Sequence, residues 1–139
     1  MIYAEILAGG KGTRMGNTEL PKQFLMLGDK PIFIHTVEQF MLNRRIDKIL
    51  ICCPEAWISY TKDTLKKYIA DRTKIVVVKG GASRNDTIMN GLSLTENEYG
   101  LNDDDIVLAH EAVRPFLTQR IIDDIIDGAI KYGAVGTVV

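Results

Sequence analysis

The sequence predicts an α/β fold, a Rossmann-like three-layer sandwich in which helices cover both faces of a mostly parallel sheet. Two observations favour this class. Runs of strand length alternate along the chain with longer segments of helical periodicity. The strand-length runs are apolar at consecutive positions, which is typical of parallel strands that are buried on both faces.

The first half of the chain contains two expected strands, each followed by a helix. An apolar run predicts a strand over residues 2–7, and a proline followed by apolar residues predicts a helix over 31–42. The run at 46–53 predicts the second strand. A second proline begins the amphipathic segment at 54–69, which we expect to be the second helix.

The second half contains three expected strands and two helices. The strands are apolar and rich in valine and isoleucine. Ser83 and Thr118 are the expected N-caps of the two helices, because hydroxyl oxygens accept hydrogen bonds from first-turn N–H groups. The elements are strands over 74–79, 105–110 and 134–139 and helices over 84–99 and 118–132.

Length and composition bound the class of protein. A chain of 139 residues is long enough for one domain. Its 46% hydrophobic and 25% charged residues are those of an ordinary globular protein, and a net charge of −1 argues against nucleic-acid binding. No apolar stretch approaches the ~20 residues that span a bilayer, and Glu5 interrupts the short apolar N-terminal run. We therefore expect a cytoplasmic protein without membrane or nucleic-acid partners.

The two cysteines, Cys52 and Cys53, are adjacent in the second expected strand. Neighbouring residues of a strand point to opposite faces, so these two are poorly placed for a mutual disulfide. We interpret both as small apolar core residues.

A glycine-rich run, Leu-Ala-Gly-Gly-Lys-Gly-Thr-Arg-Met at 7–15, follows the first strand directly. Glycines let backbone N–H groups approach a polyanion closely, and Arg14 and Lys22 place two cations beside the same loop. The spacing matches neither the dinucleotide-binding fingerprint nor the P-loop. A plain surface turn is the alternative interpretation of this run alone.

Two further polar clusters follow expected strands, at 80–87 and 110–115. The carboxyl ends of parallel strands meet at one edge of a sheet, where ligands bind in such folds, so all three clusters are expected at the same edge. Ser83 begins a helix whose first N–H groups suit an anion or a nucleobase edge. Arg84, Asn85 and Thr87 add donors for a pyrimidine carbonyl or a ribose hydroxyl. A plain capped helix is the alternative.

Glu111 is the candidate Mg²⁺ ligand, because Mg²⁺ prefers oxygen ligands and nucleotide phosphates. We interpret His110 and His35 as packing or hydrogen-bonding residues and Trp57 as a core residue. The acidic run at 102–105 precedes a strand at the opposite end of the sheet, which favours a solvated turn over a metal site.

The chain resembles the sugar-phosphate cytidylyltransferases over its whole length. The motifs are the glycine-rich run, Pro-Lys-Gln-Phe at 21–24, Gly-Gly-Ala-Ser-Arg-Asn at 80–85 with Thr87, and His-Glu-Ala-Val-Arg-Pro-Phe at 110–116. Within that family, which includes methylerythritol 4-phosphate and ribitol 5-phosphate enzymes, their combination is more similar to the ribitol 5-phosphate branch. The resemblance implies the nucleotide-diphospho-sugar transferase type of fold and, for ribitol 5-phosphate, a place in teichoic acid biosynthesis.

The resemblance also implies a reaction and its residues. An alditol phosphate, here D-ribitol 5-phosphate, would attack the α-phosphorus of CTP, giving a CDP-alditol and pyrophosphate. Arg14 and Lys22 would stabilise the transition state, and Mg²⁺ would bind at Glu111. The residues implied to contact CTP are Leu7, Ala8, Gly9, Gly10, Gly81, Ala82, Ser83, Arg84, Asn85, Asp86, Thr87 and Ala112.

Three departures from the family pattern leave alternatives open. The family has Asp where this chain has Glu111, and a small residue where it has Glu5, a carboxylate that is costly on a buried strand unless paired or neutral. Family members also continue well past residue 139, so we expect 1–139 to be the nucleotide-binding part of a longer cytidylyltransferase domain that dimerises when full length. The alternatives are a catalytically silent CTP-binding fragment, methylerythritol 4-phosphate as substrate, another nucleotide base, or a scaffold domain.

Overall fold

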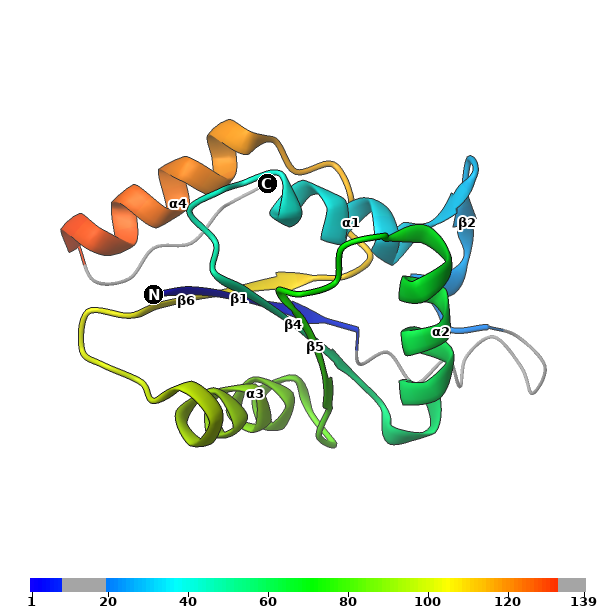
Figure 1. Ribbon diagram of the computed structural model, residues 1–139, viewed down its shortest axis with the longest axis horizontal. Coiled ribbons are helices and arrows are strands. Elements are labelled where there is room, and N and C mark those ends of the chain that lie inside the picture. Colours follow the sequence, from blue (N-terminus) through cyan, green and yellow to red (C-terminus); the bar gives the residue numbers. More distant parts are fainter. Residues whose placement is uncertain (9–19, 133–139) are drawn as a thin grey trace.

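A parallel sheet with the strand order β5-β4-β1-β6 forms the centre of the molecule (Figure 1). The computed structural model describes residues 1–8 and 20–132. Strand β1 lies inside the sheet, where Ile6 is in register with Ile51 on one side and His110 on the other. The predicted α/β class with a mostly parallel sheet is confirmed. The strands are β1 (Ile2–Leu7), β4 (Lys48–Cys53), β5 (Ile75–Lys79) and β6 (Ile106–Glu111).

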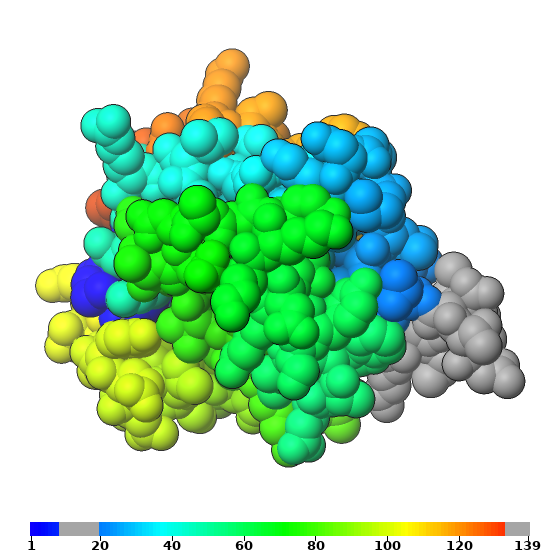
Figure 2. Space-filling view, turned by 45° about the vertical axis from the view of Figure 1, so that its right-hand side comes forward, coloured from blue at the N-terminus to red at the C-terminus, as the bar shows by residue number. Residues whose placement is uncertain are grey.

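Helices cover both faces of this sheet. Figure 1 shows α1 and α4 on one side and α3 on the other, and in Figure 2 α2 lies at the front with α1 above it and α3 below. The core follows the same division, because alternate residues of a strand point to opposite faces. Ile6 and Ile51 pack with residues of α1, α2 and α4, whereas Leu50 packs toward α3. The helices are α1 (Ile32–Met41), α2 (Ile58–Tyr68), α3 (Arg84–Tyr99) and α4 (Gln119–Tyr132).

The expected N-caps and core cysteines are confirmed. Ser83 Oγ accepts a hydrogen bond from Asp86 N at 3.1 Å, and Thr118 Oγ1 accepts one from Ile121 N at 3.2 Å. Both thiols are buried, Cys52 toward α3 and Cys53 toward the opposite face. Burial raises the pKa of the Cys52 thiol to about 12.

Several boundaries differ from the sequence-based expectation. The second strand begins at Lys48 rather than at residue 46, because Ile46 N bonds to Asn43 O in the preceding turn. The segment expected to be one helix from residue 54 starts as a 3-10 turn, η3 (Glu55–Trp57), before α2. Strand β6 is shifted by one residue against the prediction. The fifth strand expected at 134–139 lies outside the described residues.

One element was missed entirely. A short hairpin, β2 (Met26–Leu27) with β3 (Lys30–Pro31), precedes α1, and Gly28 at its tip has a φ of +70°. Only glycine adopts that conformation without strain, so Gly28 was the available sequence signal. Strands of two residues are too short to show a period-2 pattern.

The acidic run at 102–105 forms a turn, as expected, but Asp105 is not left to solvent. Its carboxylate pairs with the Met1 amino group at 2.6 Å and also accepts a hydrogen bond from Asn102 N. These two hydrogen bonds, the one from the Met1 amino group first, lower the pKa of the Asp105 carboxyl. The pair fixes the start of β1 beside the start of β6.

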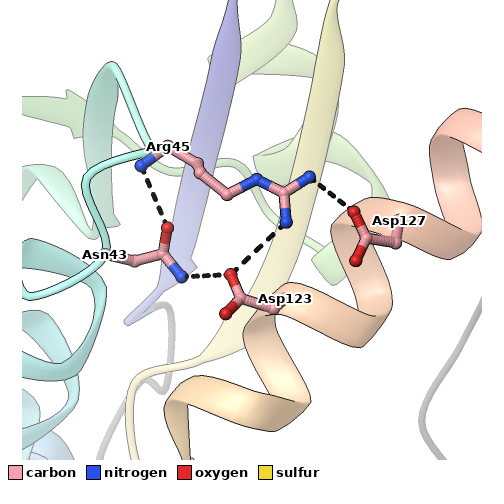
Figure 3. A network of polar contacts seen from close by, with 4 residues as sticks. All are labelled: Asn43, Arg45, Asp123 and Asp127. Atoms are coloured by element: carbon pink, nitrogen blue, oxygen red, sulfur yellow. Dashed lines mark hydrogen bonds and ion pairs between the residues drawn. The ribbon is translucent and has the colours of Figure 1, made fainter.

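Figure 3 shows the polar network that holds α4 against the loop between α1 and β4. Arg45 contacts Asp127 at 2.6 Å and Asp123 at 3.4 Å, and Asn43 Nδ2 donates to the same Asp123 oxygen at 2.9 Å. Asn43 also accepts a hydrogen bond from Arg45 N, which orients both side chains of the loop. All four residues are joined in one network and are not isolated surface ion pairs, which contribute little to stability.

Glu5 is a buried carboxyl on the central strand. Its side chain is 1% exposed, and neither carboxyl oxygen has a hydrogen-bond partner among the described residues. It points toward α3, where Gly91 leaves room for it, because a Cβ at Gly91 would overlap the carboxyl group. Desolvation raises the pKa of Glu5 to about 7. The carboxyl is therefore accommodated in the core in its neutral, protonated form and not by pairing with a cation.

None of the helices within residues 1–8 and 20–132 has the length and apolar character needed to cross a bilayer.

We expect Glu5 to make the free energy of unfolding depend on pH between about 4.5 and about 7. In this window the folded protein keeps the Glu5 proton while the unfolded chain, whose carboxyl has a pKa near 4.5, releases it. The contribution of Glu5 to the free energy of unfolding is therefore fully present below pH 4.5. As the pH rises to about 7, the free energy of unfolding falls by an amount on the order of 3 kcal/mol. Urea denaturation at several pH values should show this decline in wild type and not in Glu5→Gln. Parallel curves for the two proteins would contradict it.

We expect Gly91→Ala to destabilise the protein by about 1–3 kcal/mol, since the added methyl group overlaps the Glu5 carboxyl. In a Glu5→Ala background the same substitution should cost nothing, because the space is vacated. Ser93→Ala, at an exposed position of α3, controls for the helix propensity of alanine. Urea denaturation of wild type, the Gly91→Ala and Glu5→Ala variants and their combination gives the coupling, and equal costs in both backgrounds would refute the contact.

Candidate functional site

The ends of β1, β4 and β6 are tied together by backbone hydrogen bonds. Ala8 N bonds to Cys52 O at 2.8 Å, and Ala112 N bonds to Leu7 O at 3.0 Å. Leu7, Ala8 and Ala112 are all buried. The chain therefore leaves β1 from a fixed point, and three of the residues implied to contact CTP lie together at this edge.

The glycine-rich run itself begins at the next residue. Gly9, Gly10 and Arg14 lie outside the described residues, so the relation of Arg14 to Lys22 stays a prediction. Lys22, which follows this run in the sequence, is exposed at the start of the 3-10 turn η2 (Lys22–Phe24).

Two buried polar side chains that the sequence analysis did not single out hold this edge in place. Gln23 Nε2 donates to Ala8 O at 2.8 Å, and Thr36 Oγ1 donates to Ala112 O at 2.8 Å. Gln23 is 1% exposed and Thr36 is fully buried. In the Pro-Lys-Gln-Phe motif, Lys22 is exposed, whereas Gln23 and Phe24 are buried. The motif therefore combines a solvent-facing cation with residues that pack inside the protein. The sequence feature that could have indicated the role of Gln23 was its position next to Lys22, a candidate cation.

The second segment, from Gly80 to Thr87, folds into a tight turn onto α3. Gly80 N bonds to Cys53 O at 2.7 Å, and Gly81 N donates to Thr87 Oγ1 at 3.0 Å. Thr87 Oγ1 in turn donates to Ser83 O at 2.9 Å. A Cβ at Gly81 would overlap Asp86, so this position requires glycine because of the close approach of the turn to the helix.

This turn leaves the start of α3 open to solvent. Residues 82–86 are exposed, whereas Thr87 is buried. The exposed set contains the predicted contact residues Ala82, Ser83, Arg84, Asn85 and Asp86. The Asp86 N–H is already capped by Ser83 Oγ, but the side chains of this set reach solvent, and the helix dipole favours negative charge at this end.

An ion pair joins the second segment to the third. Arg84 Nε, on the first residue of α3, lies 2.8 Å from Glu111 Oε1, on the last residue of β6. Both side chains reach solvent, with exposed fractions of 61% and 36%. The predicted metal ligand Glu111 is thus paired with a predicted nucleotide-contacting residue.

The predicted Mg²⁺ site can be compared with the side chains that are available as metal ligands. No group of three His, Cys, Asp or Glu side chains capable of holding a metal occurs within residues 1–8 and 20–132. Mg²⁺ is often held by one or two carboxylates together with substrate phosphates and waters. Glu111 as a ligand of a Mg²⁺ ion that is shared with a bound phosphate stays a prediction.

The residues interpreted as structural have structural contacts. His110 Nε2 lies 2.8 Å from Arg114 O, and its ring packs on Phe40 at 5.5 Å between centroids. His35 Nε2 lies 2.6 Å from Leu27 O in the hairpin. Trp57 packs against Phe24 at 5.2 Å. The interpretation of the two histidines is confirmed, and Trp57 is half-buried on η3 and packs against the edge of the core.

Comparison with known proteins agrees with the motifs. Residues 2–139 match the sequence model of the family described as 2-C-methyl-D-erythritol 4-phosphate cytidylyltransferase. The ribitol-5-phosphate cytidylyltransferase of Lactiplantibacillus plantarum is 58% identical over 139 residues, which is all of this chain and 59% of that relative. The chain therefore spans about three-fifths of the length of this relative. The matches confirm the resemblance predicted from the sequence.

Solved structures show the same fold. The 4-diphosphocytidyl-2C-methyl-D-erythritol synthase of Anaerococcus prevotii superposes with a TM-score of 0.69 at 27% identity, covering 94% of this chain and 51% of that one. The 2-C-methyl-D-erythritol 4-phosphate cytidylyltransferase of Francisella tularensis gives a TM-score of 0.70 at 28% identity, covering 92% and 51%.

We expect Thr87→Val to destabilise the turn at the start of α3 by about 1–3 kcal/mol. Valine keeps the shape but leaves Gly81 N without its acceptor. Thr87→Ser retains the hydroxyl and should stay close to wild type. Chemical denaturation of the three proteins tests this, and a Thr87→Val protein as stable as Thr87→Ser would show that the hydroxyl does not hold the turn.

Proposed function

We propose, from the premise that this chain belongs to the 2-C-methyl-D-erythritol 4-phosphate cytidylyltransferase family, that it forms the CTP-binding part of a cytidylyltransferase. One observation carries the proposal. The carboxyl ends of β1, β5 and β6 lie at one edge of the sheet, where the exposed start of α3 is joined to Glu111 at the end of β6. Any parallel sheet gathers these ends, but a scaffold domain would have no need for polar side chains that reach solvent there, such as Arg84 and Glu111.

The proposed acceptor is an alditol phosphate, with D-ribitol 5-phosphate as the first choice. The support is the 58% identity to a protein named ribitol-5-phosphate cytidylyltransferase. Methylerythritol 4-phosphate is the second candidate, because the family description and the solved structure from Francisella tularensis carry that name.

The proposed reaction is an in-line displacement at phosphorus. A phosphate oxygen of the alditol phosphate forms a bond to the α-phosphorus of CTP, while the bond from that phosphorus to the oxygen bridging to the β-phosphate breaks. Pyrophosphate leaves and a CDP-alditol remains. Such a reaction requires positioning and positive charge around the phosphorus more than covalent help from the protein.

We assign the residues by their place at the edge. Backbone N–H groups after β1, with Arg14 and Lys22, would hold the triphosphate and stabilise the charge that develops on it. The exposed start of α3, with Ser83 to Asp86, would receive the cytosine and ribose. Glu111 would hold Mg²⁺, which when bound neutralises charge on the phosphates.

CTP binding by isothermal titration calorimetry tests the proposal. We expect CTP to bind in preference to UTP, GTP and ATP, and Lys22→Gln to weaken CTP binding about tenfold, because a hydrogen bond to a charged group is worth about 1.5 kcal/mol. Lys66→Gln, which removes an exposed lysine of α2, is the matched control. Preference for a purine or no binding of CTP would refute the proposal.

Pyrophosphate release, measured in a mixture of CTP, Mg²⁺ and either alditol phosphate, distinguishes an enzyme from a catalytically silent module. Release with ribitol 5-phosphate supports the first-choice substrate. CTP binding without release by this chain or by a full-length version would favour the catalytically silent interpretation.

A further inference from the structure

The face of the sheet that α3 covers has the smaller of the two cores. Among the described residues, the buried apolar cluster on the opposite face is several times larger. The buried positions of α3 itself hold small residues, Thr87, Gly91 and Thr95. The buried apolar residues beneath this helix are Tyr3, Leu7, Leu50, Cys52 and Val78. Because segments with few buried apolar contacts open at a lower free energy than the whole protein, we expect α3 to open locally.

Glu5 lies at the centre of the contact between β1 and α3. It is in register with Leu50 of β4 on one side and with Ala109 of β6 on the other. Its carboxyl group is buried against Gly91, the middle one of the three buried positions of α3. Neither carboxyl oxygen has a hydrogen-bond partner among the described residues. Since position 91 has no side chain, α3 packs closely enough to keep water from this carboxyl.

The neighbouring positions of β1 and β4 supply no charge that compensates Glu5. Tyr3 lies on the same face of β1, and desolvation raises the pKa of its phenol. Cys52 of β4 also lies on this face, and burial raises the pKa of its thiol to about 12. Both groups are therefore neutral near pH 7. The Lys48 ammonium lies over the ring of Tyr99, 5.2 Å from its centroid.

The charged groups of β6 and α3 also leave Glu5 unpaired. Glu111, at the end of β6, is paired with Arg84. Glu96 and Glu98, the carboxylates in the second half of α3, are exposed. Desolvation is therefore the cause that raises the pKa of Glu5 to about 7.

Ionisation of Glu5 acts on α3 and not on β1. A buried carboxylate is costly unless it gains water or a cation. Strand β1 is held by hydrogen bonds to β4 and to β6, whereas α3 rests on the Glu5 side chain through packing at Gly91. Movement of α3 away from the sheet is therefore the change that hydrates the carboxylate. The exposed start of the helix moves with the rest, because Arg84–Tyr99 is one continuous helix.

We propose that Glu5 is a positioning residue whose proton keeps α3 packed on the sheet, so that loss of this proton opens α3 locally together with the helix start assigned to the nucleotide. The proposal rests on the proposed function for the role of that helix start. In the packed state the pKa of Glu5 is raised to about 7, and in the open state it approaches its ordinary value of 4.5. The proton therefore stabilises the packed state fully below pH 4.5, and this contribution is lost as the pH rises to about 7.

Amide hydrogen exchange of the nucleotide-free chain tests the proposal, followed by NMR at pH 6 and pH 8 and corrected for the intrinsic exchange rate. We expect the opening constant of α3 to rise about tenfold between these pH values, the factor that pKa values of about 7 and 4.5 give for one linked proton. We also expect it to exceed the opening constant of α4 at both pH values, because α4 belongs to the larger core. Equal opening constants for the two helices would mean that Glu5 acts only through unfolding of the whole protein, and would overturn the proposal.

Variants identify the carboxyl that is responsible. Glu5→Gln should change the α3 opening constant less than about twofold between pH 6 and pH 8, because an amide does not titrate. Glu96→Gln, which removes an exposed carboxyl of the same helix, should keep the full rise. Glu5→Ala provides the same comparison if the buried amide of Glu5→Gln prevents folding. A full rise in Glu5→Gln or Glu5→Ala, or its loss in Glu96→Gln, would show that another group is responsible and that the proposal is wrong.

Addition of CTP keeps this result separate from the proposed function. Bound CTP should lower the opening constant of α3 at pH 8, because a ligand stabilises the state that binds it. CTP that binds and leaves this constant unchanged would overturn the link between α3 and the nucleotide. If CTP fails to bind while the pH response still depends on Glu5, the proposed function is wrong and the control of α3 by Glu5 stands. If CTP binds and the opening constant does not respond to Glu5, the proposed function stands and the role of Glu5 is wrong.

Discussion

The hydrogen bonding of β1 to β4 on one side and to β6 on the other is the constraint on which the site depends. It continues past the last residue of the strand, through Ala8 N to Cys52 O and Ala112 N to Leu7 O. Two buried side chains, Gln23 and Thr36, donate hydrogen bonds to the carbonyl oxygens of Ala8 and Ala112. With its backbone groups paired in this way, the edge presents fixed starting points to the loops that leave it.

The fold could be predicted where its signal is local and repeated. Strands that are apolar on both faces, and helix starts marked by Ser83 and Thr118, are visible in the sequence because burial and capping each demand particular residue types. The hairpin around Gly28 and the 3-10 turn before α2 were not predictable, since elements of two or three residues carry no period. Their positions are set by contacts with α1 and Phe24, which are tertiary.

The site was predictable in its location and less so in its internal contacts. Topology alone places the segments after β1, β5 and β6 at one edge. The sequence did not indicate that Arg84 meets Glu111, because that contact depends on the length of one side chain and on where α3 starts. Likewise, Thr87 was expected to face the ligand as a donor, and its hydroxyl is engaged with Gly81 and Ser83 inside the turn.

The placement of the cysteines on β4 gives the molecule two internal reporters. The chain has two cysteines, and both are fully buried, one on each face of the sheet. A thiol reagent can therefore modify Cys52 only after the layer formed by α3 lifts away, and Cys53 only after the opposite layer does. Labelling kinetics of the two single-cysteine variants would distinguish which layer opens first.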